Sequence, residues 1–423
     1  MKKYLLAVTL FMASVYAHSQ DLKSISLNVT LNKFDQAKTE VDSYLANEKN
    51  AAKPEGWYYK AYIYNSLGRV ATKPLAESKS LYQSAFDAIK KYADLDPKQP
   101  LTIEEKNSTV FNIYFGEYDL GIKTYNDKNF EESYECFKKA LEVHDYIFSK
   151  NITGPNNLKF SAHDTDAVWN LAIIANTLKK IDDVAIYYKK IADADLGDEK
   201  YATAYDELVL KYKREKNAEL FAKYLAAAKK HYPVDIPYWE NKEIDFAISD
   251  LEGEALLNKY EELTKTLPNN YVVFYNYAVD IDKFLGSDAA KGKDVTAYKN
   301  KIEELFKKTI AIKSTIEGNL QLANLYYSKT YDLQEQAAKI KGTKPAEVKV
   351  KNDVLASIKT TMNLAIPYAE EAARLLGELK EYKFADKTNY KLAMEILTNA
   401  YKMNGNAAKL AEYTKKKAEV DKL

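Results

Sequence analysis

The sequence predicts an all-α protein built as a solenoid, in which pairs of helices follow one another along the chain. Two amphipathic helices joined by a short polar break, as in Val168–Tyr188, recur nearly to the C-terminus, and such recurrence is typical of helical repeats. Glycine (13) and proline (10) are scarce among 423 residues, which disfavours a turn-rich all-β fold. Apolar residues make up 46% and charged residues 29%, so the chain is predicted to be globular.

Residues 1–19 are predicted to be a secretory signal peptide. Lys2 and Lys3 precede a mostly apolar run, Tyr4–Ala17, which is too short to span a bilayer comfortably. Small residues fit cleavage before Gln20, and cleavage after Ala17 is the alternative. We therefore expect export to the periplasm, with outer-membrane association left open. A buried N-terminal helix is the other interpretation of this segment.

Net charge and cysteine content limit the classes of partner and of chemistry that the chain suits. Removing residues 1–19 takes away two of the 62 basic residues and none of the 61 acidic ones, which leaves a net charge of −1 (60 against 61). Such a chain has no bulk attraction for nucleic acid or anionic lipid. The single cysteine, Cys136, excludes an intramolecular disulfide. Its place in the middle of a predicted helix indicates a small buried hydrophobic residue rather than a catalytic thiol.

Residues 20–423 are predicted to form the solenoid, with a regular core at about 101–340 and atypical repeats at both ends. The first pair spans roughly Leu22–Glu48. The second opens at Trp57, its first helix stops at Leu67-Gly68, and an insertion covers about Arg69–Ser78. One face of the first pair is apolar, at Phe34, Ala37, Val41 and Tyr44.

The third and fourth pairs have the clearest apolar stripes. Asn129 is expected to cap a helix, with Glu132 returning a hydrogen bond in a capping box. The inward stripe of that helix is predicted at Phe130, Ser133, Phe137, Ala140 and Leu141. The two helices of the fourth pair are expected to bury Val168, Leu171, Ala172, Ala175 and Leu178, and Ile181, Val184, Ala185, Tyr188 and Ile191.

Five further pairs complete the array of about nine. The fifth and sixth end near Pro233 and Pro268, and the seventh carries an insertion at Gly286–Asp294. The eighth has long helices with a break at about 341–346, and the last covers about Lys387–Leu423. The large residue central to each second helix recurs 36 residues apart at best and further apart where loops are longer, through Val41, Ile89, Phe137, Tyr188, Tyr224, Tyr260 and Phe306.

These pairs resemble the tetratricopeptide repeat (TPR) family, whose repeat of about 34 residues has a W-x2-L-G-x2-Y first helix and an A-x3-F second helix. Leu120-Gly121 matches the first helix, although Thr124 stands at the expected tyrosine. The second-helix pattern is matched at Ser133, Phe137 and Ala140, and the first-helix pattern again at Leu322-Ala323 and Tyr326. The resemblance covers about Leu22–Leu423 unevenly and implies a groove lined by first helices. From their positions in the repeat, the resemblance implies that seven aromatic residues face that groove: Tyr58, Tyr62, Tyr118, Tyr125, Trp169, Tyr275 and Tyr327. The alternative interpretation is that these rings pack against neighbouring helices.

Motifs for catalysis, metals and cofactors are lacking in the sequence. His163-Asp164-Thr165-Asp166 has the residues of an acid–base or metal cluster, but Asp164 or Thr165 is better explained as a helix cap. Gly286–Asp294 resembles a phosphate loop with the wrong glycine spacing and an aspartate at the hydroxyl position. We therefore expect no catalytic residue, no metal, no cofactor and no enzyme.

Three functions remain at this stage. The first is a periplasmic scaffold that binds a protein or peptide of unknown identity through its concave groove. The alternative is an outer-membrane-associated glycan or nutrient-binding protein that stacks sugars on Tyr and Trp, although no cysteine suited to a lipid anchor lies near the signal. The third is an envelope hydrolase using His163 and its neighbouring aspartates.

Overall fold

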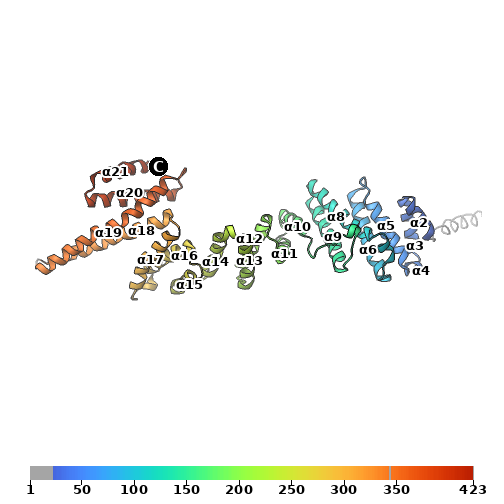
Figure 1. Ribbon diagram of the computed structural model, residues 1–423, viewed down its shortest axis with the longest axis horizontal. Coiled ribbons are helices and arrows are strands. Elements are labelled where there is room, and N and C mark those ends of the chain that lie inside the picture. Colours follow the sequence, from blue (N-terminus) through green and yellow to red (C-terminus); the bar gives the residue numbers. More distant parts are fainter. Residues whose placement is uncertain (1–21, 343, 423) are drawn as a thin grey trace, which may run out of the picture. The chain divides into compact units, whose positions relative to one another are not determined.

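The computed structural model describes residues 22–342 and 344–422, and this part of the chain consists of helices and loops without a strand. It contains twenty α-helices, α2–α21, of which eighteen follow one another as nine helix pairs and two, α4 and α7, are short (Figure 1). The predicted all-α fold of about nine helix pairs is therefore confirmed. The predicted signal peptide lies outside the described residues. The chain divides into two compact units, one ending at Pro233 and one beginning at Val234.

The first unit holds five helix pairs and two short helices, α4 (Glu48–Ala51) and α7 (Pro100–Glu104). Each pair packs against the next along the chain (Figure 1). Its pairs are α2 (Leu22–Thr30) with α3 (Phe34–Leu45), α5 (Pro54–Gly68) with α6 (Leu75–Leu95), α8 (Ser108–Asn126) with α9 (Phe130–Ser149), α10 (Thr165–Thr177) with α11 (Ile181–Asp193), and α12 (Ala202–Arg214) with α13 (Ala218–His231).

The second unit holds four pairs, of which the third is the longest (Figure 1). In it α18 and α19 form a long hairpin, and α20 packs against both helices. The pairs are α14 (Ile236–Ile248) with α15 (Gly253–Thr266), α16 (Tyr271–Leu285) with α17 (Thr296–Ile312), α18 (Ile316–Lys339) with α19 (Pro345–Gly377), and α20 (Phe384–Asn404) with α21 (Ala407–Val420).

Helix starts confirm one predicted cap and correct another. Asp164 caps α10, because its Oδ1 accepts the Ala167 N–H at 3.0 Å. The predicted capping box at α9 is wrong, since the Asn129 side chain makes no cap hydrogen bond. The Asn129 N–H already donates to the Thr124 carbonyl at 2.8 Å, so Glu132 has no amide to return to and instead pairs with Lys79 of α6.

The core of each pair is a stripe of second-helix side chains packed against a small residue of the first helix. Phe137 is buried, and a Cβ on Gly121 would lie 2.9 Å from its ring. Tyr82 of α6 lies even closer to Gly116 of α8, where a Cβ would come within 2.3 Å of the ring. The expected burial of Ile181 is wrong. As the first residue of α11 it precedes the inward stripe and is 67% exposed.

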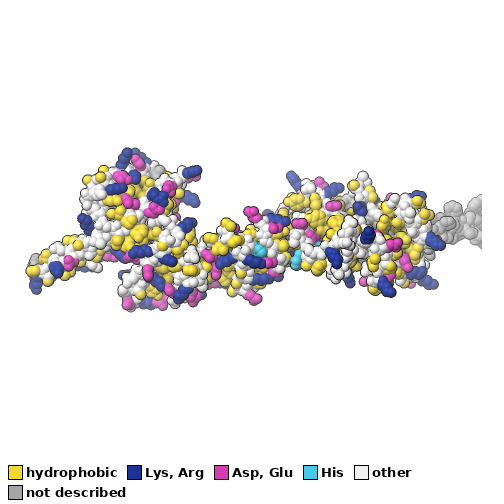
Figure 2. Space-filling view, in the orientation of Figure 1, with side chains coloured by type: hydrophobic (Ala, Val, Ile, Leu, Met, Phe, Trp, Pro, Cys, Tyr) yellow, Lys and Arg dark blue, Asp and Glu magenta, His cyan; other side chains and the backbone are white. Residues whose placement is uncertain are grey.

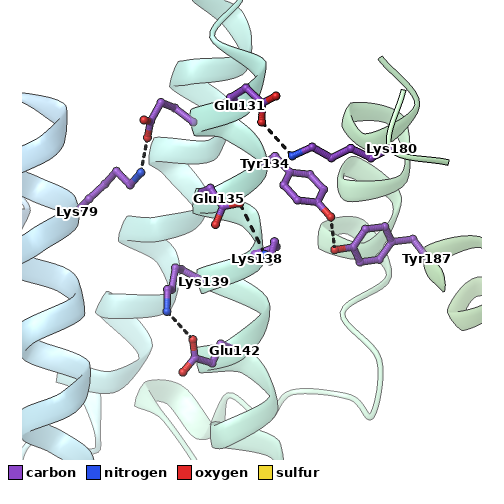
Figure 3. A network of polar contacts seen from close by, with 10 residues as sticks. Lys79, Glu131, Tyr134, Glu135, Lys138, Lys139, Glu142, Lys180 and Tyr187 are labelled. Atoms are coloured by element: carbon purple, nitrogen blue, oxygen red, sulfur yellow. Dashed lines mark hydrogen bonds and ion pairs between the residues drawn. The ribbon is translucent and has the colours of Figure 1, made fainter. Parts of the chain in front are cut away.

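Polar contacts connect successive second helices along α9 (Figure 3). On one side Glu132 binds Lys79 of α6. On the other side Glu131 accepts a hydrogen bond from Lys180 at 3.0 Å, and the hydroxyls of Tyr134 and Tyr187 lie 3.1 Å apart. These contacts fix the α9 surface against both neighbouring second helices.

A recurring triplet of tyrosine, lysine and acid joins neighbouring helices in both units. In one example Glu303 of α17 accepts hydrogen bonds from the Tyr326 hydroxyl at 2.8 Å and from Lys329 at 2.7 Å, while that ammonium lies 5.6 Å from the Tyr326 ring centre. The other triplets are Asp42 with Tyr64 and Lys60, Asp193 with Tyr224 and Lys223, Glu261 with Tyr277 and Lys301, and Glu370 with Tyr413 and Lys409.

Candidate functional site

Hollows recur between successive first helices in both units, and the second helix between them forms the floor. The central aromatic residues Phe137, Tyr188 and Phe306 each line such a hollow. This geometry follows from the pair itself. Two first helices are held apart by the second helix that connects them, so the space above its central side chain stays open. The first-helix face is therefore the candidate site.

The hollow between α8 and α10 has the most apolar rim. Its volume is about 150 Å³, and Phe137 of α9 forms its floor. Ile122 and Tyr125 from α8 and Ile173 from α10 line it, and these side chains are 43%, 40% and 36% exposed. Hydrophobic side chains come to the surface over this part of the first unit (Figure 2). Exposed apolar side chains grouped around a hollow are typical of an interaction surface.

One polar residue, Asn170 of α10, lies in the same rim. Its Nδ2 donates a hydrogen bond to the Tyr118 hydroxyl at 3.2 Å. The Tyr118 ring in turn packs edge-on against Phe137, with centroids 5.1 Å apart. The amide and the ring thus hold the wall of the hollow in place, while the Asn170 carbonyl oxygen is left to accept a hydrogen bond from a ligand.

A second hollow, on the other side of α8, is polar. It has a volume of about 370 Å³ and lies between the end of α5, the loop that follows it, α6 and α8. Arg69, Lys73 and Lys123 line it together with a single carboxylate, Asp119. Its floor is Tyr82; burial raises the pKa of that hydroxyl to about 12, and the charge of Arg69 opposes the rise.

Three further hollows repeat the arrangement. One of about 280 Å³ lies between α10 and α12 over Tyr188. In the second unit, one of about 360 Å³ lies between α16 and α18 over Phe306, and one of about 420 Å³ lies between α18 and α20. These hollows have a more even mixture of polar and apolar side chains than the one between α8 and α10, so they define no preferred ligand by themselves.

The seven predicted groove residues are divided between hollows and packing. Tyr125 lines the hollow between α8 and α10, and Tyr327 lines the one between α18 and α20 although it is buried. The other five are half-buried and their rings contact neighbouring side chains: Tyr58 with Tyr92, Tyr62 with Phe34, Tyr118 with Phe137, Trp169 with Tyr201, and Tyr275 with Phe306. Partner binding by these residues stays a prediction.

Sequence reasoning missed the two isoleucines of the rim, Ile122 and Ile173. A signal for Ile173 exists, because α10 is apolar over Ala167–Trp169 and Leu171–Ala175, which is wider than the single stripe that a surface helix needs. Ile122 gives no such signal, since it lies between Leu120-Gly121 and the polar Lys123-Thr124 without widening an apolar run. For Arg69 the sequence predicts only that it belongs to an insertion. Its position beside α8 depends on the way in which α5 ends.

Groups with catalytic potential do not converge in the described part of the chain. His163 is exposed, and Asp164 is occupied by the cap of α10 and by the Tyr114 hydroxyl at 2.8 Å. No group of three or more potential metal ligands occurs among residues 22–342 and 344–422. Burial raises the pKa of the Cys136 thiol to about 12, which suits a packing role. Within the same residues, no helix is long and apolar enough to span a membrane.

Fold and site together define a helical-repeat protein of tandem helix pairs, with the arrangement that the TPR resemblance implies and a first-helix face open to a ligand. No protein-family model and no curated protein matches the sequence.

Solved helical structures match most of the chain at low similarity. A human IFIT1 dimer with PPP-AAAA is 14% identical, with a TM-score of 0.23 and coverage of 94% of this chain and 89% of that one. A circular tandem repeat protein is 10% identical, with a TM-score of 0.19 and coverage of 100% and 91%. The APC/C hetero-tetramer Cut9-Hcn1 is 14% identical, with a TM-score of 0.16 and coverage of 94% and 85%. At these TM-scores the likeness adds nothing to what the helix pairs themselves show.

Proposed function

We propose that this protein is a non-catalytic scaffold that binds a segment of a partner protein along its first-helix face. The hollow between α8 and α10 is the main anchoring point. The observation that carries the proposal is the apolar rim of Ile122, Tyr125 and Ile173 around a floor of Phe137. Burying such side chains against a partner is favourable by about 25 cal/mol per Å² of apolar surface.

The chemistry of this hollow favours a protein segment over a sugar. Its walls are aliphatic side chains and one tyrosine, and a single amide supplies polarity. Stacking on a sugar would need an open aromatic face, whereas the rings of Tyr118, Tyr125 and Trp169 are already packed against Phe137, Phe130 and Tyr201. A leucine- or phenylalanine-sized side chain suits the aliphatic walls, and its backbone N–H would find the Asn170 oxygen as an acceptor.

We also propose that the protein works in the periplasm after removal of residues 1–19. The support is the charged start, the short apolar run and the small residues before Gln20. Cell fractionation followed by N-terminal sequencing checks this. We expect an envelope protein that begins at Gln20 or, with the alternative cleavage, at His18. A protein that keeps Met1, or one recovered from the cytoplasm, would contradict the location without touching the binding face.

Photo-crosslinking in living cells tests the binding face. A benzophenone amino acid replaces Ile173 at the hollow, and in a matched control it replaces Ile186, which is 52% exposed on α11 and lies outside the hollows described above. We expect a discrete adduct containing a second protein, identified by mass spectrometry, from position 173 only. Equal adducts from both positions, or none from position 173, would contradict the proposal.

A further inference from the structure

We propose that the partner segment is acidic as well as apolar, and that its carboxylate occupies the hollow between α5 and α8 while its apolar side chain occupies the hollow between α8 and α10. This inference rests on the proposed function and adds the chemistry of the partner. Two observations carry it: a convergence of unused hydrogen-bond donors in one hollow, and the continuity of both hollows across a single helix.

The polar hollow gathers donors that have no partner within the described residues. The guanidinium of Arg69 and the ammonium of Lys123 form neither a hydrogen bond nor an ion pair there, and the Asn112 amide and the Ser78 hydroxyl likewise lack a hydrogen-bond partner. Ser78 is buried and Asn112 is half-buried, and such polar groups normally find partners, whereas Arg69 and Lys123 are exposed to solvent. A set made of a guanidinium, an ammonium, an amide and a hydroxyl matches what a carboxylate accepts.

The charge balance of the hollow also favours an anion. Arg69, Lys73 and Lys123 stand against Asp119 alone in the lining. Lys73 is paired with Glu77 on the first turn of α6, which leaves Arg69 and Lys123 against Asp119, an excess of one positive charge for a ligand. Because the whole chain is nearly neutral, this local excess is a property of the site rather than of the composition.

The α8 surface connects the two hollows. Phe115 lines the polar hollow and Ile122 the apolar one, and they lie seven residues apart on the same face of the helix. Phe115 is 44% exposed, and the exposed Asp119 lies between it and Ile122 on that face, so the ridge carries an apolar ring and one carboxylate. A helix with side chains is about 10–12 Å across. An extended chain covers roughly 3.3–3.6 Å per residue, so about three to four residues separate the acidic and apolar side chains of the partner.

Selection from a library of random peptides displayed on phage, using the purified protein, tests the inference. Recovered peptides are synthesised with a fluorophore, and their Kd is measured by fluorescence polarisation. We expect large apolar residues accompanied by Asp or Glu about three to four positions away. Replacing that acid by lysine is expected to weaken binding roughly threefold to tenfold, and raising the salt concentration is expected to reduce the difference.

Charge reversal in the protein makes the test specific. Arg69→Glu is expected to weaken binding of the acidic peptide and to restore binding of the peptide in which lysine replaces the acid. Asp119→Asn is expected to tighten binding of the acidic peptide. The matched control is Lys91→Glu, at an exposed position of α6 outside the hollow, and we expect it to leave both peptides unaffected.

The possible outcomes distinguish a failure of this inference from a failure of the proposed function. Peptides that lose binding in Ile173→Lys but show no acid preference, or no response to Arg69→Glu, would overturn the acidic partner and leave the scaffold in place. Failure to recover any peptide, or peptides indifferent to Ile173→Lys, would overturn both.

Discussion

Several tyrosine hydroxyls in this protein donate to carboxylates that are also paired with lysine. The triplet around Glu303 shows the energetics. Burial alone would raise the pKa of Glu303, but hydrogen bonds from Lys329, Lys307 and Tyr326 outweigh it and lower the pKa to about 2. This arrangement gives a physical reason for the many tyrosines and lysines of the sequence, because one hydroxyl and one ammonium per acid fix the contact between neighbouring helices.

The Glu303 triplet predicts a loss of stability at acidic pH. A carboxyl whose folded pKa of about 2 lies below its ordinary 4.5 stabilises the fold fully above pH 4.5 and loses this contribution as the pH falls toward 2. Glu303→Gln is expected to cost about 1–2 kcal/mol at pH 7 and to flatten the acid limb of a urea-denaturation series. The control is Glu304→Gln on the same helix, whose carboxylate makes no hydrogen bond or ion pair in the described chain. An equal loss from both variants would argue against the triplet.

Glu117 is expected to behave in the opposite way. It is 3% exposed, its Oε2 has no hydrogen-bond partner among the described residues, and burial raises its pKa to about 8. Because the folded pKa lies above the unfolded value of about 4.5, its contribution is fully present below pH 4.5 and is lost as the pH rises through 8.

Glu117→Met should therefore raise the free energy of unfolding at pH 8 by about 2 kcal/mol or more and leave it little changed at pH 5. Urea denaturation at the two pH values is the measurement, and Glu135→Met at an exposed position of α9 is the control. A variant that is less stable at pH 8 would show that the carboxylate is accommodated as an ion.

The environments of some single residues could be predicted from the sequence, and those of others could not. Burial of Cys136 and capping by Asp164 followed from local pattern alone. The capping box at Asn129 and the burial of Ile181 did not hold, because both depend on neighbours. The Thr124 carbonyl takes the Asn129 N–H, and Ile181 stands one turn before the stripe that contacts α10.

At the scale of helices, the second helix of each pair stabilises the pair and also shapes the hollow above it. Phe137 is 2% exposed, packs on Gly121 and Tyr118, and forms the floor between α8 and α10. Helix pairs could be predicted because their apolar period is local. Their hollows could not, since these arise from the separation of helices that are far apart in sequence.

Phe137→Ala is expected to lower the free energy of unfolding by about 3–5 kcal/mol, less if Tyr118 collapses into the cavity. Phe148→Ala on the same helix serves as the control, because that ring is 45% exposed and its loss should cost well under about 1 kcal/mol. Chemical denaturation followed by circular dichroism reports both values. Equal small effects would mean that Phe137 does not carry the packing of this pair.

At the scale of the whole molecule, one arrangement recurs in both units: hollows lie between first helices, above the second helix that connects them. Polar cross-links join neighbouring helices, both along α9 (Figure 3) and between the first helices α8 and α10. The resemblance to TPR proteins predicts a groove lined by first helices. Of the seven predicted residues, Tyr125 and Tyr327 line hollows described above, and partner binding by all seven stays a prediction. The resemblance selects these aromatic residues by their position in the repeat. The exposure of each ring depends instead on which side chains of the next helix pair cover it.

Hydrogen–deuterium exchange with and without a peptide selected on the purified protein tests the central claim most directly. If the first-helix face binds the partner, exchange slows in Ser108–Asn126 and Thr165–Thr177 when the peptide saturates the protein, and the rates in α13 stay unchanged. Slowed exchange confined to the second helices α9 and α11, with no change in α8 and α10, would contradict the claim.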